Sequence, residues 1–141
     1  HKWEYIHDEA GYNYKLPALN ASLGVSQLSN LKLIIKKKRQ LYINYKKKLN
    51  TLNFIRVFKE PKNAKSNYWL QTLLIDRQNR KLKNKIIKIF NKNQIMARPA
   101  WKLLHTLQHL KKFPRMNLDV SRDLYSRIIN IPSSPNLIKK I

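Results

Sequence analysis

A long helical repeat of apolar residues, from Pro17 to Asn50, is the feature that most constrains the fold of this chain. Its apolar residues recur at spacings of three and four or multiples of them, which at about 100° per residue draws one stripe along a helix. The stripe consists of Leu28, Leu31, Ile35, Tyr42, Tyr45 and Leu49. Lysines project from the opposite side, so the pattern predicts a helix with one core-packed and one solvated face. Ser29-Asn30 is expected to divide it into a short helix and a long one.

Short runs of branched and aromatic residues follow and predict strands. These runs are Phe54–Phe58, Tyr68–Ile75, Gln94–Ala97 and Ile128–Ile131. We assign Tyr68 and Trp69 to the sheet core. A second amphipathic helix is expected between the second and third runs, with Leu82, Ile86, Ile89 and Phe90 inward and Lys81, Lys83, Lys85 and Lys88 mostly outward. A shorter helix is expected from Val120 to Arg127, and a tail helix at the end. The sum predicts an α+β fold, with long helices packed on a small sheet of about three strands.

Length and composition limit the class of protein. A chain of 141 residues buries one modest core, and an apolar share of 43% argues against disorder. No apolar run approaches the roughly 20 residues that span a bilayer, and the amino terminus has no signal-peptide pattern. The chain has no cysteine, which excludes a disulfide framework and fits a cytoplasmic protein. Since no initiator methionine is present, we expect the sequence to begin inside a larger polypeptide.

The net charge of +23, from 30 lysines and arginines against 7 acids, has two interpretations. It fits a module that binds nucleic acid or an anionic surface. It also fits drift toward A/T-rich codons, because lysine outnumbers arginine, and asparagine and isoleucine are abundant. We favour drift, because no nucleic-acid motif is recognisable. A nucleic-acid-binding module is kept as the alternative function, and it predicts an affinity that falls steeply with salt.

A compact polar segment, Gly11 to Lys15, stands directly ahead of the helix start at Leu16-Pro17. Asn13, Tyr14 and Lys15 offer an amide, a hydroxyl and a cation near the amide donors of a helix amino terminus, where anionic groups bind. A rigid turn with a satisfied helix cap is the alternative interpretation.

Four blocks resemble, in the right order, a known family. They are His7–Leu28, Ser66–Leu70, Ala97–Trp101 with His105, and Asn130–Ser134. Together they resemble the DegT/DnrJ/StrS sugar aminotransferases, which are fold-type-I enzymes dependent on pyridoxal phosphate. His7–Ala10 resembles most closely the branch of legionaminic-acid-type pathways. The resemblance begins beyond the cofactor lysine of the family, which implies a carboxy-terminal portion. Residues 1–50 then form an interdomain segment with the long helices, and residues 51–141 form the small α+β domain of such an aminotransferase.

The resemblance also implies site residues. Asn13 matches the asparagine that reaches across the family dimer to the cofactor phosphate or the sugar adduct, so Asn13, Tyr14 and Lys15 are the candidate cofactor-binding residues. Most relatives carry arginine where this chain has Lys15, and lysine keeps the charge but lacks the planar fork that binds an anion in bidentate fashion. Arg98, Pro99, Ala100 and Trp101 match the segment that lines the sugar-nucleotide entrance, and with Asn13 they are the candidate substrate-binding residues. A strand end with a buried tryptophan is the alternative for this segment.

The implied function is the carboxy-terminal part of a homodimeric aminotransferase. The enzyme moves an amino group, with glutamate as donor, to a nucleotide-linked keto sugar for surface polysaccharide or amino-sugar biosynthesis. No lysine here matches the Schiff-base motif, so no catalytic residue is assigned and the chain alone is expected to be inactive. No two-ligand metal motif and no Walker or dinucleotide loop is present, and no metal site is predicted. An inactive gene remnant remains a further alternative.

Overall fold

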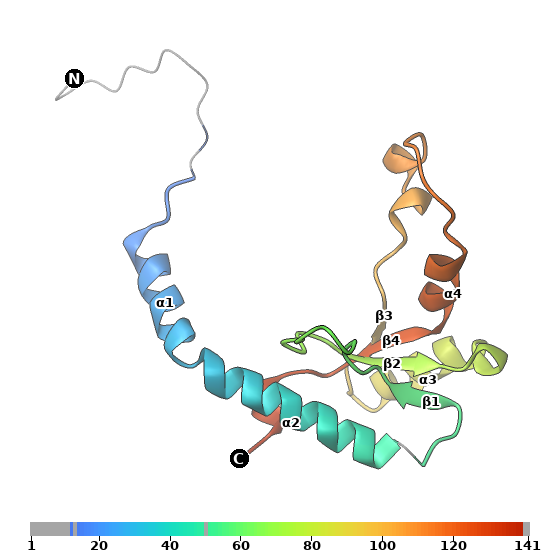
Figure 1. Cartoon of the computed structure of the whole chain (residues 1–141), viewed down its shortest axis with the longest axis horizontal. Coiled ribbons are helices and arrows are strands. Elements are labelled where there is room, and N and C mark those ends of the chain that lie inside the picture. Colours follow the sequence, from blue (N-terminus) through green and yellow to red (C-terminus); the bar gives the residue numbers. More distant parts are fainter. Residues whose placement is uncertain (1–11, 13, 50, 140–141) are drawn as a thin grey trace. The chain divides into compact units, whose positions relative to one another are not determined.

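A computed structural model describes residues 12, 14–49 and 51–139 (Figure 1). The chain divides into two compact units, residues 1–32 and residues 33–141. The α+β fold class is confirmed. The predicted division into residues 1–50 and 51–141 stays a prediction. Gly11 and Asn13, from the polar segment ahead of the first helix, lie outside the described residues.

The first unit contains helix α1, Ala18–Ser29. Pro17 caps it in an extended conformation, and its carbonyl oxygen accepts a hydrogen bond of 3.0 Å from the amide of Ala21. A turn at Asn30 separates α1 from α2, Leu31–Leu49, as the sequence predicted. No residue of α1 is buried, and Leu28 is 67% exposed, so the predicted core-packed stripe is wrong in this part of the chain.

The second unit is built on an antiparallel sheet in the order β1-β2-β4-β3 (Figure 1). Its strands are β1, Ile55–Val57; β2, Gln71–Ile75; β3, Arg98–Pro99; and β4, Ile128–Ile131. The sheet therefore has four strands instead of about three.

Two predicted strands have different bounds. The strand expected over 68–75 begins only at Gln71, because Tyr68 has a left-handed backbone with φ 49°. The strand expected at Gln94–Ala97 is absent: Gln94 lies in a turn with a left-handed φ of 59°, residues 95–97 have no regular structure, and pairing starts at Arg98. A left-handed residue cannot continue an extended ladder.

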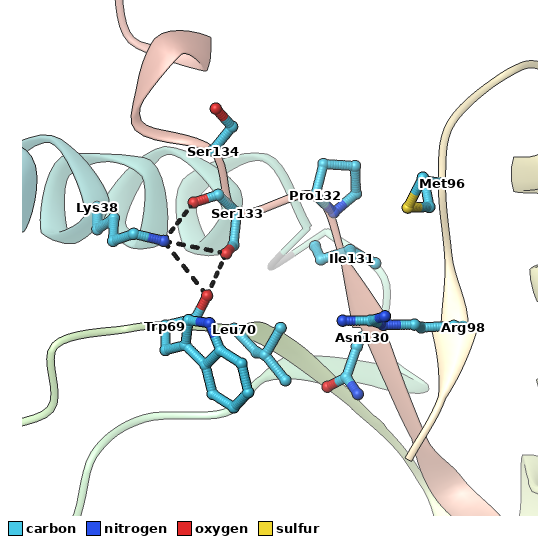
Figure 2. Close-up of a pocket in the computed structure, with 10 residues that line it drawn as sticks. All are labelled: Lys38, Trp69, Leu70, Met96, Arg98, Asn130, Ile131, Pro132, Ser133 and Ser134. Carbon is cyan, nitrogen blue, oxygen red and sulfur yellow. Dashed lines mark hydrogen bonds between the residues drawn. The ribbon is translucent and has the colours of Figure 1, made fainter. Parts of the chain in front are cut away.

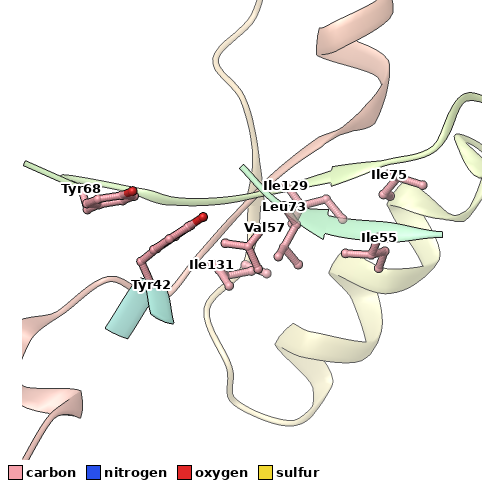
Figure 3. Close-up of a cluster of buried hydrophobic side chains, with 9 residues drawn as sticks. Tyr42, Ile55, Val57, Tyr68, Leu73, Ile75, Ile129 and Ile131 are labelled. Carbon is pink, nitrogen blue, oxygen red and sulfur yellow. The ribbon is translucent and has the colours of Figure 1, made fainter. Parts of the chain in front are cut away.

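The core lies on one face of this sheet (Figure 3). Side chains alternate along a strand, so Leu73, Ile75 and Ile129 share the core face. Tyr42, Tyr45 and Leu49 of α2 and Ile86, Ile87 and Phe90 of α3, Leu82–Lys92, pack against it. Thr72 and Asn130 point to the opposite face, where the Thr72 hydroxyl donates to Asn130 Oδ1 over 3.0 Å.

Helix α3 is rotated relative to the prediction. Ile89 is 51% exposed, whereas Ile87 packs inward. Lys83, expected outside, is buried, and its ammonium donates to the main-chain oxygen of Tyr125 in α4, Asp119–Arg127. The ammonium also lies 4.5 Å from the centroid of the Tyr125 ring. Burial lowers the pKa of Lys83. The predicted tail helix is only a short 3₁₀ turn, Pro135–Leu137.

The position of the core gives a matched test of stability. Ile75→Ala is expected to lower the free energy of unfolding by about 3 kcal/mol, because it leaves a cavity in a fully buried site. Ile89→Ala, the same change on the exposed side of α3, is expected to stay within about 0.5 kcal/mol. Urea unfolding followed by circular dichroism measures both. Equal losses in the two variants would contradict the assignment of the core.

Candidate functional site

A pocket of about 390 Å³ opens beside the carboxyl end of β4 (Figure 2). Its walls come from α2, the segment before β2, the edge strand β3 with the residues before it, and the turn after β4. The lining residues are Lys38, Trp69, Leu70, Met96, Arg98, Asn130, Ile131, Pro132, Ser133 and Ser134. Two cations and no carboxylate are among them, so the pocket favours an anionic group.

Arg98 enters the pocket because of strand register. It pairs with Asn130 across β3 and β4, and directly opposed residues project from the same face of a sheet. Among the described residues Arg98 forms no ion pair. Its guanidinium lies 5.7 Å from the centroid of the Trp101 ring, so Arg98 and Trp101 lie together while the charge stays free for an anion.

Trp101 is stacked on Trp69. The two ring centroids are 5.8 Å apart and the planes are inclined by 21°. Both residues are 63% exposed. The assignment of Trp69 to the sheet core is therefore wrong, and so is the alternative of a buried Trp101. Tyr68 does lie in the core, where its ring stacks on Tyr42 with centroids 4.7 Å apart.

Lys38 of α2 joins three segments at the pocket wall. Its ammonium donates to the carbonyl oxygens of Ser133, at 2.7 Å, and of Trp69, at 3.3 Å (Figure 2). Further contacts are to the Ser133 hydroxyl at 3.2 Å and to the Tyr68 carbonyl at 3.5 Å. The Ser133 hydroxyl in turn donates to the Trp69 carbonyl. Burial lowers the pKa of Lys38, because removal from water disfavours the charged ammonium.

An ion pair holds the loop that leads to Trp69. Arg39 binds Glu60 in bidentate fashion, at 2.9 and 3.0 Å, and also donates to the carbonyl of Ser66 at 2.6 Å. Glu60 accepts from the amide of Ser66 as well. These hydrogen bonds hold the pKa of Glu60 below its ordinary value, with the bond from Arg39 as the largest cause.

The other predicted site residues that the structure describes do not line the pocket. Pro99 is exposed in β3, and Ala100 is half-buried beside it. Tyr14 and Lys15 are exposed in the first unit, where the rings of Tyr12 and Tyr14 stack with centroids 5.7 Å apart. Asn13 lies outside the described residues, so its role stays a prediction.

Sequence reasoning missed Lys38, Trp69 and Ser133 as parts of the pocket. The blocks Ser66–Leu70 and Asn130–Ser134 carried the resemblance and thus pointed to two of them. Nothing distinguished Lys38 from its lysine neighbours on the same helix.

Comparisons with known proteins place the chain. The model of the DegT/DnrJ/EryC1/StrS aminotransferase family matches residues 1–140. The chain belongs to this family. Over 94% of this chain, it is 32% identical to the GDP-perosamine synthase of Vibrio cholerae. Over the same share of this chain, it is 34% identical to EpsN of Bacillus subtilis (strain 168), whose name includes the words pyridoxal phosphate-dependent aminotransferase.

Solved structures of aminotransferases have the same fold. Helicobacter pylori PseC, an aminotransferase involved in the biosynthesis of pseudoaminic acid, superposes with a TM-score of 0.83 over 96% of this chain and 37% of its own, at 22% identity. TlmJ of Streptoalloteichus hindustanus gives 0.82 at 17% identity, covering 96% of this chain and 36% of its own. At these identities the likeness concerns the fold alone. The chain spans about 35% of the length of the curated relatives it matches.

The described residues of this family member do not fit pyridoxal phosphate by themselves. The cofactor needs a free amine and a carboxylate for its ring nitrogen. The pocket beside β4 has no carboxylate, and the ammonium of Lys38 in its wall is occupied by main-chain oxygens. A hollow at residues 59–64 contains Glu60, but this carboxylate is ion-paired with Arg39.

The described residues provide neither a metal site nor a membrane-spanning helix. Within residues 12, 14–49 and 51–139, no group of three or more histidine, aspartate or glutamate side chains is arranged to hold a metal ion. In the same part of the chain, no helix has the length and apolarity to cross a membrane.

The ion pair between Arg39 and Glu60 predicts a pH-dependent stability. Glu60→Gln is expected to lower the midpoint of thermal unfolding at pH 7, because the neutral amide cannot replace the bidentate carboxylate. The folded-state pKa of Glu60 is depressed, so its contribution is present above the ordinary value of 4.5 and is lost as the pH falls through the folded-state pKa. The gap between wild type and variant should therefore narrow below pH 4.5.

The control for this measurement is Asp76→Asn, since the Asp76 side chain forms no ion pair among the described residues. A gap that is unchanged at low pH, or as large in Asp76→Asn, would contradict the role of Glu60.

Proposed function

We propose that this chain is the carboxy-terminal part of a pyridoxal phosphate-dependent aminotransferase that aminates a nucleotide-linked keto sugar. Glutamate is the proposed donor, and surface polysaccharide or amino-sugar biosynthesis is the proposed process. The observation that carries the proposal is the cationic pocket at Arg98, with Trp69 in its wall and Trp101 stacked on Trp69, in a member of a sugar aminotransferase family. A nucleotide sugar has an anionic diphosphate beside flat and apolar surfaces, which is the chemistry that this pocket suits.

Each residue has a proposed task. The guanidinium of Arg98 binds diphosphate oxygens, since it has several donors and no acidic partner among the described residues. Trp101 packs against the sugar or the base, with Pro99 and Ala100 forming the adjoining edge. The relative named GDP-perosamine synthase supports a nucleotide-linked ligand without identifying the nucleotide used here.

The first unit is proposed to serve the cofactor. In this proposal the enzyme is a homodimer, and Asn13, Tyr14 and Lys15 face the phosphate of pyridoxal phosphate held by the partner protomer. The exposure of Tyr14 and Lys15 leaves both side chains available for such a contact. The cofactor supplies the electron sink for amino transfer when bound, and the rest of the enzyme supplies its lysine. The lack of cysteine agrees with a cytoplasmic location.

Arg98→Ala in the complete enzyme tests the substrate site. We expect KM for the keto-sugar nucleotide to rise about 10-fold or more with a smaller change in kcat, because a charge-assisted contact to an unreacting group is lost. The control is Arg80→Ala, an exposed arginine outside the pocket. Steady-state kinetics with several keto-sugar nucleotides measure both. Absence of aminotransfer with every sugar, together with salt-resistant binding of an oligonucleotide, would overturn the proposed function.

Asn13→Ala tests the cofactor contact separately. We expect weaker binding of pyridoxal phosphate to the complete enzyme, by roughly 5-fold, since one neutral hydrogen bond contributes about 1 kcal/mol. Absorbance of the bound cofactor during its titration gives the affinity, and Asn20→Ala on α1 is the matched control. An unchanged affinity and turnover in Asn13→Ala would remove Asn13 from the site.

A further inference from the structure

We infer that Lys38 is a positioning residue that holds Trp69 in its stack with Trp101, and that the stacked pair receives the flat base of the nucleotide. The ligand class rests on the proposed function. The role of Lys38 rests on the contacts of the second unit alone.

Hydrogen bonds to the main chain of Trp69 fix the position of this residue. Its side chain is 63% exposed, so burial does not fix the direction of the indole. Its main chain is instead held from both sides. The amide of Trp69 donates to Asn67 Oδ1 at 2.9 Å, and its carbonyl accepts from Lys38 and from the Ser133 hydroxyl. The indole therefore leaves a fixed backbone, and its stack with Trp101 depends on that backbone.

Tyr68, the residue before Trp69, has a strained backbone. Tyr68 has a φ of 49°, which is unfavourable for an aromatic residue and persists only where the surroundings hold it. The amide of Tyr68 donates to Ser66 Oγ at 2.9 Å, and its ring is stacked on Tyr42. The left-handed turn directs the chain out of the core, so that Tyr68 is buried whereas Trp69 faces the pocket.

The charged ammonium of Lys38 donates hydrogen bonds to uncharged groups. The ammonium has three N–H donors, and its partners are the neutral oxygens of Tyr68, Trp69 and Ser133. It forms no ion pair among the described residues. These bonds tie α2 to the segment before β2 and to the turn after β4, so the ammonium fixes the wall of the pocket from which Trp69 projects.

The stacked indoles of Trp69 and Trp101 suit a flat ligand. Two stacked indoles with exposed surface present a flat apolar face, on which a base can stack with little sequence or chemical preference. Arg98 lies 5.7 Å from the Trp101 ring, so a cation stands beside that face where a phosphate attached to the base can reach it. A rigid face lowers the entropy cost of binding, which is the contribution we assign to Lys38.

The position of Trp69 can be measured without any ligand. The full chain is labelled with 5-fluorotryptophan, and the fluorine resonances of Trp69 and Trp101 are assigned with Trp69→Phe and Trp101→Phe. Lys38→Met keeps the length of the side chain and removes the ammonium. We expect it to shift both resonances, whereas Lys36→Met, on the exposed side of the same helix, shifts neither. Unchanged resonances in Lys38→Met would overturn the positioning role.

Chemical rescue separates the ammonium from general packing. The chain has no cysteine, so Lys38→Cys introduces a single thiol. Alkylation with 2-bromoethylamine restores an ammonium at lysine length and should return the wild-type resonances, whereas alkylation with 2-bromoethanol should not. Equal rescue by both reagents would overturn the role of the charge. Where Lys38→Met does not fold, Ser133→Ala decides, because it removes one of the two donors to the Trp69 carbonyl.

Nucleotide binding tests the task of the stack. GDP, UDP and dTDP are titrated into the complete enzyme. Trp69→Leu should weaken the tightest of them about 5- to 150-fold, the range for loss of one base stack. Lys38→Met should weaken it in the same direction, and the double variant should be no weaker than Trp69→Leu, because one residue acts through the other. Additive losses, or no nucleotide binding, would overturn this inference.

The two proposals fail in different ways. An enzyme that binds a nucleotide in a Lys38-dependent manner but transfers no amino group overturns the proposed function alone. An enzyme that aminates a keto-sugar nucleotide with an unchanged KM in Lys38→Met overturns the inference alone.

Discussion

The antiparallel pairing of β2 with β4 is the constraint on which the second unit depends. It places Thr72 opposite Asn130, 58 positions further along the chain, and Leu73 opposite Ile129. The second pair faces the core and the first faces away from it. A slip of one residue would exchange these faces and would expose the most buried side chains, so the apolar pattern of both strands holds the register. The edge strand β3 pairs with β4, and the same register therefore sets where Arg98 points.

The regular elements could be predicted because their signals are local. The break at Asn30 and the strand Ile128–Ile131 follow from a cap residue and from branched side chains. The start of β2 could not be predicted, because Tyr68 and Trp69 favour strands by composition. Their conformation is decided by Lys38, Ser133 and Asn67, and two of these are distant in sequence. Tertiary contacts here override β propensity.

The pocket was predicted only where a resemblance pointed to it. Arg98 and Trp101 belong to one short block, and the structure brings their side chains together. Lys38 and Ser133 are separated by 95 positions, and no periodicity or spacing links a lysine to a main-chain oxygen so far away. Lys83 was placed wrongly for a similar reason, since its acceptor is a carbonyl of another helix, 42 positions away. Contacts from side chain to backbone leave little trace in a single sequence.

The enclosure of Lys83 between α3 and α4 makes it different from the exposed lysines around it. Its nitrogen is shielded from solvent and occupied by a carbonyl and an aromatic ring. Reagents that acylate amines will modify the exposed lysines first and reach Lys83 only when the two helices part. The rate at which Lys83 is modified, measured by mass spectrometry, therefore reports how often α3 and α4 separate locally.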